Sequence, residues 1–403
     1  MLSSDLRRSY VDFYTSRGHT EISGSSLIGD STVLFTSAGM QPLIPYFSGA
    51  PHPAGRRLVN VQRCLRTVDI DAVGDDSHLT CFEMLGNWSL GDYYKHESLS
   101  WTLEWLLSIG IPFERLGVTV FEDDAYARTI WRQSDVPDDR VRVFGREENW
   151  WGPPGPHGPC GPDSELFYIH DDGRWLELGN NVFIVHEQGV DGSLRPLPQH
   201  NVDVGLGLER IAGVLQGVSS VYETDLFRDT VGKVRELSRS PDTRAERIVS
   251  DHVRSSVLLA GDGVRPSNSA HGYILRRLLR RAIRQGRVLG IDGPFVREVG
   301  RTVLEDPGVL DVLEAEERRF AGTLRRGLRE LERISDVDGR ELFRLFETYG
   351  LPPELTLEEL GLTFEWREGF ERAASEHRAR SQRGSQRTSF LTANPSDHGS
   401  DGP

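Results

Sequence analysis

The sequence is poor in cysteine and methionine, with only three of each among its 403 residues. Cys64, Cys81 and Cys160 are odd in number and lack the paired spacing that a zinc site needs. We therefore expect neither a disulfide framework nor a structural zinc site. A reducing compartment, the cytoplasm, is the expected location.

Long hydrophobic runs are also missing. No apolar stretch approaches the roughly 18 residues that a membrane-crossing helix requires. Residues 1–19 are polar and charged, without the apolar segment and cleavage site of a secretion signal. The sequence therefore predicts a protein without a membrane partner and without an export signal.

Basic residues are in the minority, with 47 Lys and Arg against 61 Asp and Glu and a net charge of −14. This balance argues against indiscriminate binding of nucleic acid. Residues 271–290 are different, because they contain no acid and six arginines: Arg276, Arg277, Arg280, Arg281, Arg284 and Arg287. We expect one basic helix on an acidic body, which suits a nucleic acid that binds in one place. Arg277, Arg281 and Arg284 are the predicted phosphate contacts.

The length predicts two or three domains, and the pattern of apolar residues changes near residue 243. Residues 1–242 mix helical with strand-like runs. The predicted helices are 2–17 and 98–109, the predicted strands 118–121, 165–169 and 176–186, and a stiff Gly/Pro loop is predicted at 152–162. Residues 243–380 show helical periodicity, with helices expected around 274–283 and at 310–334, 339–349 and 367–380. Residues 381–403 are polar, and we expect them to be disordered.

Two stretches carry candidate chemistry. Residues 61–95 suit a hairpin whose first strand offers an arginine to a phosphate and whose second offers an aromatic ring to a base. Taken alone, such a pair is more often a surface ion pair above a core aromatic. In residues 201–213, Gly205 and Gly207 precede Glu209 and Arg210 at the expected start of a helix. Glycines allow the backbone to approach a ligand closely, although tight packing of a helix on a strand explains them equally well.

The order and wording of these stretches resemble motifs 2 and 3 of class II aminoacyl-tRNA synthetases, and the alanyl-tRNA synthetase family in particular. The similar segments are FTSAGMQPLIPYFSG (35–49), FEMLGNWSLGDYYKH (82–96), NWW followed by GPCGPDSELFY (149–168), VDVGLGLERIAGVLQG (202–217) and SDHVRSSVLLAGDGVRPSNSAHGYILRRLLRRAIRQG (250–286). They are collinear and span roughly residues 5–380. The resemblance implies an α+β fold, with an antiparallel sheet flanked by helices and followed by an all-helical domain.

The resemblance also implies roles for particular residues. Arg66 matches the arginine on the α-phosphate of ATP, Phe82 the ring that stacks on adenine, and Arg210 the arginine at the γ-phosphate. His78, Gly205 and Gly207 complete the implied ATP site. In the implied alanine pocket, Trp151 matches a wall, Asp203 matches the carboxylate that binds the ammonium, and Asn180 and Val182 match residues at the border.

The implied reaction joins alanine to ATP and then transfers it to the 3′ end of tRNA(Ala). A carboxylate is already a nucleophile, so the first step needs in-line positioning and neutralised phosphate charge, supplied by arginines and Mg²⁺, rather than a general base. No ligands for Mg²⁺ are identified. In the implied tRNA-binding domain, Asn268 matches a residue that reads a wobble G·U pair, and Glu354 stands where the family has an aspartate.

Several departures keep a second function open. Glu354 replaces the family's aspartate, and residues 77–79 lack an arginine that precedes the motif 2 aromatic in the family. The strand NNVFIVH (180–186) differs from the usual NxVFMQF, and no segment resembles the editing domain. We therefore expect an alanine–tRNA ligase without editing. The alternatives are a paralogue that transfers alanine to a small molecule or peptide, and a regulator that binds without catalysis.

Overall fold

The computed structural model describes residues 1–403 except 30–32, 332, 335 and 378–403. Its residues group into two compact units, Met1–Glu314 and a second that begins at Ala315. The first unit extends past the predicted boundary near residue 242, because helix α7 (Thr243–Gly261) contacts strand β3 (Cys81–Leu90) within it. A functional boundary near residue 242 stays a prediction. The predicted disordered tail, 381–403, lies outside the described residues.

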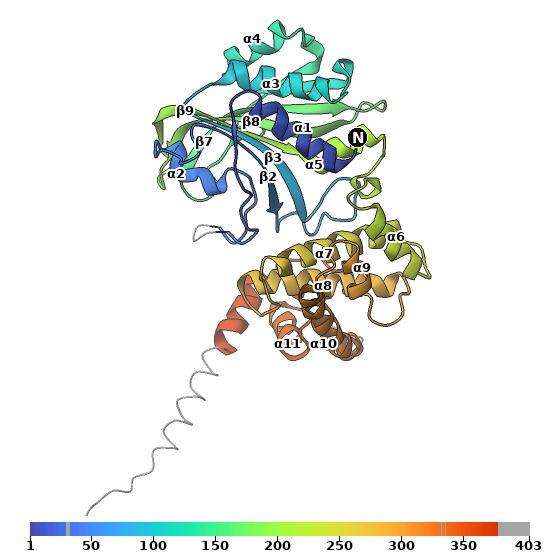
Figure 1. The fold of residues 1–403 in the computed structure, drawn as a ribbon. Coiled ribbons are helices and arrows are strands. Elements are labelled where there is room, and N and C mark those ends of the chain that lie inside the picture. Colours follow the sequence, from blue (N-terminus) through green and yellow to red (C-terminus); the bar gives the residue numbers. More distant parts are fainter. Residues whose placement is uncertain (30–32, 332, 335, 378–403) are drawn as a thin grey trace, which may run out of the picture. The chain divides into compact units, whose positions relative to one another are not determined.

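The first unit is built on a nine-stranded sheet (Figure 1). The sheet has the strand order β1-β2-β3-β9-β8-β7-β4-β5, and β6 pairs with β7. Its strands are β1 (Thr20–Glu21), β2 (Arg57–Leu65), β3, β4 (Leu116–Phe121), β5 (Val141–Phe144), β6 (Trp150–Trp151), β7 (Gly158–Ile169), β8 (Trp175–Gln188) and β9 (Leu194–Gly207). All central pairings are antiparallel, as expected, and the parallel pairs β1–β2 and β4–β5 lie at the two ends of the strand order.

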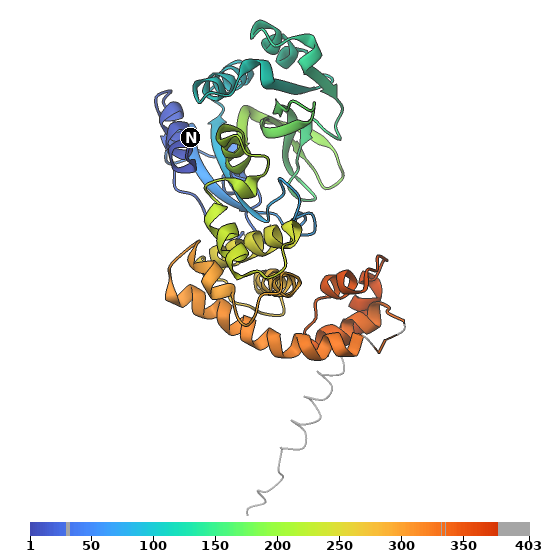
Figure 2. The same ribbon diagram turned by 90° about the vertical axis from the view of Figure 1, so that its right-hand side faces the viewer.

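Helices cover one face of this sheet. They are α1 (Ser3–Thr15), α3 (Lys95–Ser108), α4 (Ala125–Gln133) and α5 (Leu208–Gln216), and α1 lies beside α5 (Figure 2). Strand side chains alternate between faces, and on β9 it is Val202, Val204 and Leu206 that enter the core under these helices. Tyr10 of α1 and Trp105 of α3 meet edge to face in this core, with ring centroids 4.8 Å apart.

The opposite face of the sheet carries the candidate site. The alternate residues of β9 that point to it include Asp203, Gly205 and Gly207, and those of β3 include Phe82 and Trp88. A smaller apolar cluster lies here, formed by Trp88, Val182, Ile184 and residues of the segment 38–47, which contains helix α2 (Ile44–Phe47). The helix-covered face of the sheet is therefore packed with apolar side chains, whereas the opposite face carries polar groups beside glycines.

The helical part of the first unit follows α6 (Arg228–Leu237). Helix α7 packs against α8 (Ala270–Val288) and α9 (Val296–Arg301). Helix α10 (Pro307–Leu331) crosses into the second unit, which also contains α11 (Gly339–Tyr349), α12 (Pro353–Leu360) and a helical segment at 367–377. Aromatic rings of α11 and of this last segment meet, with the Phe343 and Phe370 centroids 5.4 Å apart. No described helix is long and apolar enough to cross a membrane.

The predicted Gly/Pro loop at 152–162 was wrong in its second half, because β7 begins at Gly158. Pro159 and Cys160 pair with β8, and the register shifts between Cys160 and Asp163. Proline is tolerated in a sheet at such an irregularity. A Cβ at Gly161 would lie 2.0 Å from the carbonyl oxygen of Phe183, so glycine permits the close approach of the two strands.

Candidate active site

The predicted hairpin is confirmed as strands β2 and β3, in which Cys64 lies opposite Phe82. Arg66 directly follows β2, and its backbone N–H donates to the carbonyl of Thr80, 3.0 Å away. The Arg66 guanidinium lies 5.0 Å from the centre of the Phe82 ring, a cation–π arrangement, and donates to the carbonyl of Ser37. The hairpin therefore presents a cation and an aromatic ring side by side.

Strand β9 and helix α5 form the opposite side of the site. Gly205 and Gly207 end the strand, and α5 begins at Leu208, as the sequence predicts. Arg210 lies in the first turn of this helix and donates to the Glu177 carboxylate, 2.8 Å away, and to the Glu177 carbonyl. This arginine is thus held by an acid on the neighbouring strand β8.

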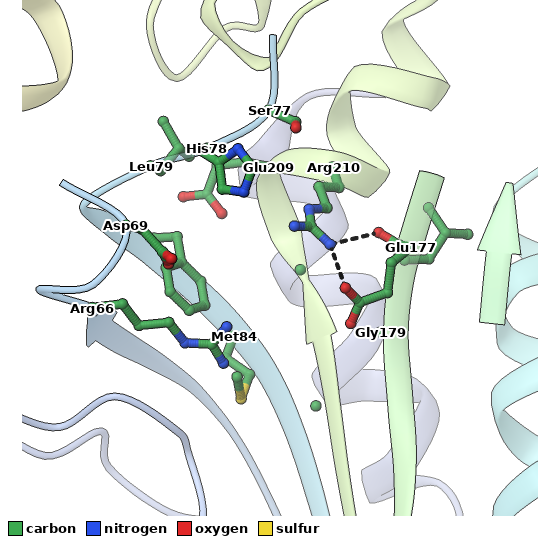
Figure 3. Close-up of a pocket in the computed structure, with 14 residues that line it drawn as sticks. Arg66, Asp69, Ser77, His78, Leu79, Met84, Glu177, Gly179, Glu209 and Arg210 are labelled. Carbon is green, nitrogen blue, oxygen red and sulfur yellow. Dashed lines mark hydrogen bonds and ion pairs between the residues drawn. The ribbon is translucent and has the colours of Figure 1, made fainter. Parts of the chain in front are cut away.

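A pocket lies between these two sides, and Arg66 and Arg210 enter it from opposite sides (Figure 3). All six residues predicted to bind ATP line it: Arg66, His78, Phe82, Gly205, Gly207 and Arg210. A Cβ at Gly205 would come within 2.8 Å of the Met84 sulfur, so the glycine keeps the pocket floor open. The pocket combines a flat apolar surface with two separated cations, which is suited to a nucleotide polyphosphate.

Glu177 and Glu209 also line the pocket, although the sequence alone predicts a binding role for neither. The Glu209 carboxylate accepts from the backbone N–H of Glu83, next to Phe82, with both oxygens at 3.1 Å. Burial, reinforced by the nearby charge of Glu83, raises the pKa of Glu209 to about 7. The position of Glu209 directly before Arg210 was the only sequence signal for it.

The four residues predicted for an amino-acid pocket lie on the same face of the sheet. Asn180 lies opposite Gly205, and Val182 lies opposite Asp203, in the pairing of β8 with β9. Trp151 packs against the cluster that contains Val182. The Oδ1 atom of Asn180 is buried and has no hydrogen-bond partner among the described residues. A polar ligand would satisfy this atom.

Asp203 is only 6% exposed and accepts a hydrogen bond from the indole N–H of Trp88, 2.7 Å away. Burial raises the pKa of Asp203 to about 7, although the Trp88 hydrogen bond acts in the opposite direction. A buried carboxylate of this kind gains most from a cationic partner. The sequence alone does not predict this role for Trp88, and its only signal is its place in the 82–96 segment.

The family model for "tRNA synthetases class II (A)" matches residues 5–399. The "Alanine--tRNA ligase" of Treponema pallidum is 43% identical to this chain, and the alignment covers 96% of the chain and 73% of that protein. The protein of the same name from Rubrobacter xylanophilus is 41% identical, with 95% and 50% covered. The chain belongs to the alanyl-tRNA synthetase family.

Membership in the alanyl-tRNA synthetase family confirms the resemblance and the class II fold. The protein from Treponema denticola is also 43% identical, and there too the alignment covers 73% of the relative. The chain therefore spans about three quarters of the treponemal relatives and half of the Rubrobacter one.

The two residues predicted to read the acceptor stem belong to different units. Asn268 is exposed in the first unit and accepts a hydrogen bond from the Arg276 guanidinium. Glu354 lies in α12 of the second unit and is half-buried. These placements leave the prediction that both residues read the acceptor stem untested.

The predicted basic helix is confirmed as α8, but its arginines differ in exposure. Arg284 is half-buried, whereas Arg281 is only 5% exposed and donates to the carbonyl of Ile70. Arg277 forms an ion pair with Asp71, with 2.9 Å between the charged atoms. The burial of Arg281 does not favour the predicted phosphate contact, because a phosphate would have to displace its bond to Ile70.

Proposed function

We propose that this protein is a ligase that activates alanine with ATP and transfers the alanyl group to the 3′ end of tRNA(Ala). The observation that carries the proposal is the common sheet face on which the pocket containing Arg66, Phe82 and Arg210 lies beside the buried Asp203. The names of the relatives support it, since each is an alanine–tRNA ligase. The cytoplasm stays the predicted compartment.

In this proposal ATP occupies the pocket between the hairpin and α5. The adenine stacks on Phe82, Arg66 neutralises the α-phosphate and Arg210 the γ-phosphate, while Gly205 and Gly207 leave room for the nucleotide. His78 borders the same pocket, and its Nδ1 bonds to Asp75. Arg210 would exchange its bond to Glu177 for the phosphate.

Mg²⁺ fits the groups that line the pocket. This ion is usually bound by one or two carboxylates together with substrate phosphates. Glu177 and Glu209 supply carboxylates in the pocket, so they are the residues that would hold it. Bound there, Mg²⁺ would neutralise charge on the phosphates.

Alanine binds, in the same proposal, next to the nucleotide. Asp203 pairs with its ammonium group, Trp151 and Val182 border its methyl group, and Asn180 offers its unpartnered Oδ1 to a polar atom. A carboxylate oxygen of alanine attacks the α-phosphorus, a new P–O bond forms, and pyrophosphate leaves. No general base is needed, because the attacking oxygen is already ionised.

In the second step a ribose hydroxyl at the 3′ end of tRNA attacks the carbonyl carbon of the adenylate, and AMP leaves. We propose that Asn268, Glu354, Arg277 and Arg284 contact the acceptor stem. Asn268 and the two arginines stand in the first unit and Glu354 in the second. Arg281, also proposed from the sequence for this contact, is buried.

Two assays on the same preparation test the proposal. Alanine-dependent exchange of pyrophosphate into ATP, without tRNA, measures the first step, and charging of purified tRNA(Ala) with labelled alanine measures both. We expect activity in both assays. Exchange without charging would favour the paralogue that uses another acceptor, and a protein with neither activity would contradict the proposal.

A further inference from the structure

The segment between β2 and β3, residues 66–80, lies between the ATP pocket and the helices α7 and α8. On one side it supplies Arg66, Asp69 and His78 to the pocket. On the other side its backbone meets a group of polar side chains in α7 and α8 that are almost completely buried. The proposed reaction gives these polar side chains no role.

Three of these side chains form a continuous chain of hydrogen bonds. The Asp251 carboxylate, 0% exposed, accepts from the backbone N–H of Thr80 at 2.9 Å through Oδ1. Its Oδ2 is 2.8 Å from Nδ1 of His252, which is also 0% exposed. Nε2 of His252 lies 3.1 Å from Nη1 of Arg281, and this same nitrogen donates to the carbonyl of Ile70.

The hydrogen bonds determine the form of the histidine. A carboxylate only accepts and a guanidinium only donates. His252 must therefore be neutral, with its proton on Nδ1 and a free lone pair on Nε2. Burial lowers the pKa of His252, and Arg281 lowers it further while Asp251 opposes this. The chain of donors and acceptors thus runs in one direction, from Arg281 to Asp251.

This chain joins the two limbs of the 66–80 segment. Ile70 follows Arg66 by four residues, and Thr80 precedes Phe82 by two. The carbonyl of Thr80 also accepts the backbone N–H of Arg66. The ends of the buried chain are therefore attached close to the two residues that present the cation and the ring to the pocket.

Packing alone does not explain this choice of residues. Buried charged groups cost free energy that apolar side chains of similar volume would not. Apolar side chains, however, could not bind the N–H of Thr80 and the carbonyl of Ile70. The polar chain fixes these two backbone groups by direction as well as distance.

We propose that Asp251, His252 and Arg281 are positioning residues that hold the 66–80 segment in its ATP-binding conformation. None of them lines the pocket, so they act through Arg66 and Phe82. The inference rests on the proposed function, because it takes the nucleotide in the pocket to be ATP. It also gives Arg281 a role inside the protein rather than on tRNA.

The decisive comparison is between two substitutions of one histidine. In His252→Gln, the side-chain amide keeps one donor and one acceptor, whereas His252→Leu removes both. We expect His252→Leu to raise the KM for ATP in alanine-dependent pyrophosphate exchange about tenfold, with the KM for alanine unchanged, and His252→Gln to recover most of the loss. Arg281→Met should behave like His252→Leu, because it removes the nitrogen that donates to both His252 and the Ile70 carbonyl. Arg287→Met, at an exposed site on the same helix, is the matched control.

A purely structural role predicts something else: a lower melting temperature and less active enzyme, with the KM for ATP unchanged. That result, or a His252→Gln variant as impaired as His252→Leu, would overturn the proposal. If the substituted proteins do not fold, hydrogen exchange of the wild-type protein tests whether the 66–80 segment is already held in place. The amide of Thr80 must then be protected without ATP, and rapid exchange there would contradict a preformed segment. If the wild-type protein showed no alanine-dependent pyrophosphate exchange, that result would instead contradict the proposed function.

Discussion

At the scale of single residues, the carboxylate of Asp203 has the most unusual environment in the proposed alanine site. Burial raises the pKa of Asp203 to about 7, so both protonation states of this carboxyl group are populated near neutral pH. Only the ionised form can pair with an ammonium group. In the proposed site, binding of alanine would therefore have to shift this equilibrium toward the carboxylate.

We predict that the KM for alanine rises as the pH falls below about 7, approaching a tenfold rise per pH unit. The KM for alanine rises rather than falls because protonation of Asp203 removes the negative partner of the alanine ammonium group. This ammonium group itself stays charged between about pH 6 and about pH 8. Measuring pyrophosphate exchange from about pH 6 to about pH 8 checks it. A KM for alanine that is flat across this pH range would contradict the pairing.

Asp203→Asn should lose alanine-dependent pyrophosphate exchange while still binding ATP, since removal of one partner of a buried pair costs about 3–5 kcal/mol.

The two arginines of the pocket lead to a second prediction. Arg66→Ala and Arg210→Ala should each slow activation by about a hundredfold or more, the scale for loss of one donor to a developing charge. Arg132→Ala serves as a control, because Arg132 is exposed and pairs with Asp138 outside the pocket. Rates of alanine-dependent exchange at saturating ATP provide the measurement. An unchanged rate in either pocket variant would mean that this arginine is only an ion-pair residue.

At the scale of elements, strand β3 shows how one face is shaped for a ligand. Gly86 leaves the space that the ring of Trp88 occupies, since a Cβ there would lie 2.4 Å from Cη2 of this ring. Trp88 is fully buried and donates to Asp203, so its ring cannot move without moving this hydrogen bond. The glycine therefore supports the position of the carboxylate indirectly.

Gly86→Ala should destabilise the protein by about 1–3 kcal/mol through overpacking and should raise the KM for alanine more than that for ATP. Denaturant unfolding and exchange kinetics give the two quantities. In contrast, Gly232→Ala in α6 meets no atom within 4 Å and should stabilise by about 0.5–1 kcal/mol. Equal KM values for alanine in Gly86→Ala and the wild type would show that Trp88 does not position Asp203.

At the scale of the whole molecule, the net charge is −14, whereas α8 contains six arginines and no acidic residue. Arg284→Gln should weaken binding of tRNA(Ala), lower the slope of log affinity against log salt concentration by about one, and leave pyrophosphate exchange unchanged. Binding titrations at several salt concentrations test this prediction. Arg301→Gln, exposed at the end of α9, should change neither quantity. If both substitutions lower the slope equally, the effect comes from total charge and not from α8.

Much of the fold could be predicted from the sequence because its signals are local. Apolar residues at helical spacing located α1 and α8, and the predicted 339–349 helix coincides with α11. The resemblance to the family was sufficient to select six of the fourteen residues that line the pocket, and their binding of ATP stays a prediction. Local sequence signals failed to predict elements whose conformation depends on their neighbours in the fold. The strand at Gly158 contains prolines and glycines that only pairing with β8 makes acceptable, and α12 was not predicted at all.

The sequence by itself determined the family, the central hairpin and the residue types at the pocket, since these follow from motifs and short-range periodicity. Only the tertiary structure decided which polar groups meet across long separations. Trp88 and Asp203 are 115 residues apart, Thr80 and Asp251 171, and Ile70 and Arg281 211. No periodicity predicts such contacts, because they depend on which strands pair and which helices pack against them. For the same reason, the arginine-rich sequence of α8 could not show that Arg281 is buried while Arg287 is exposed.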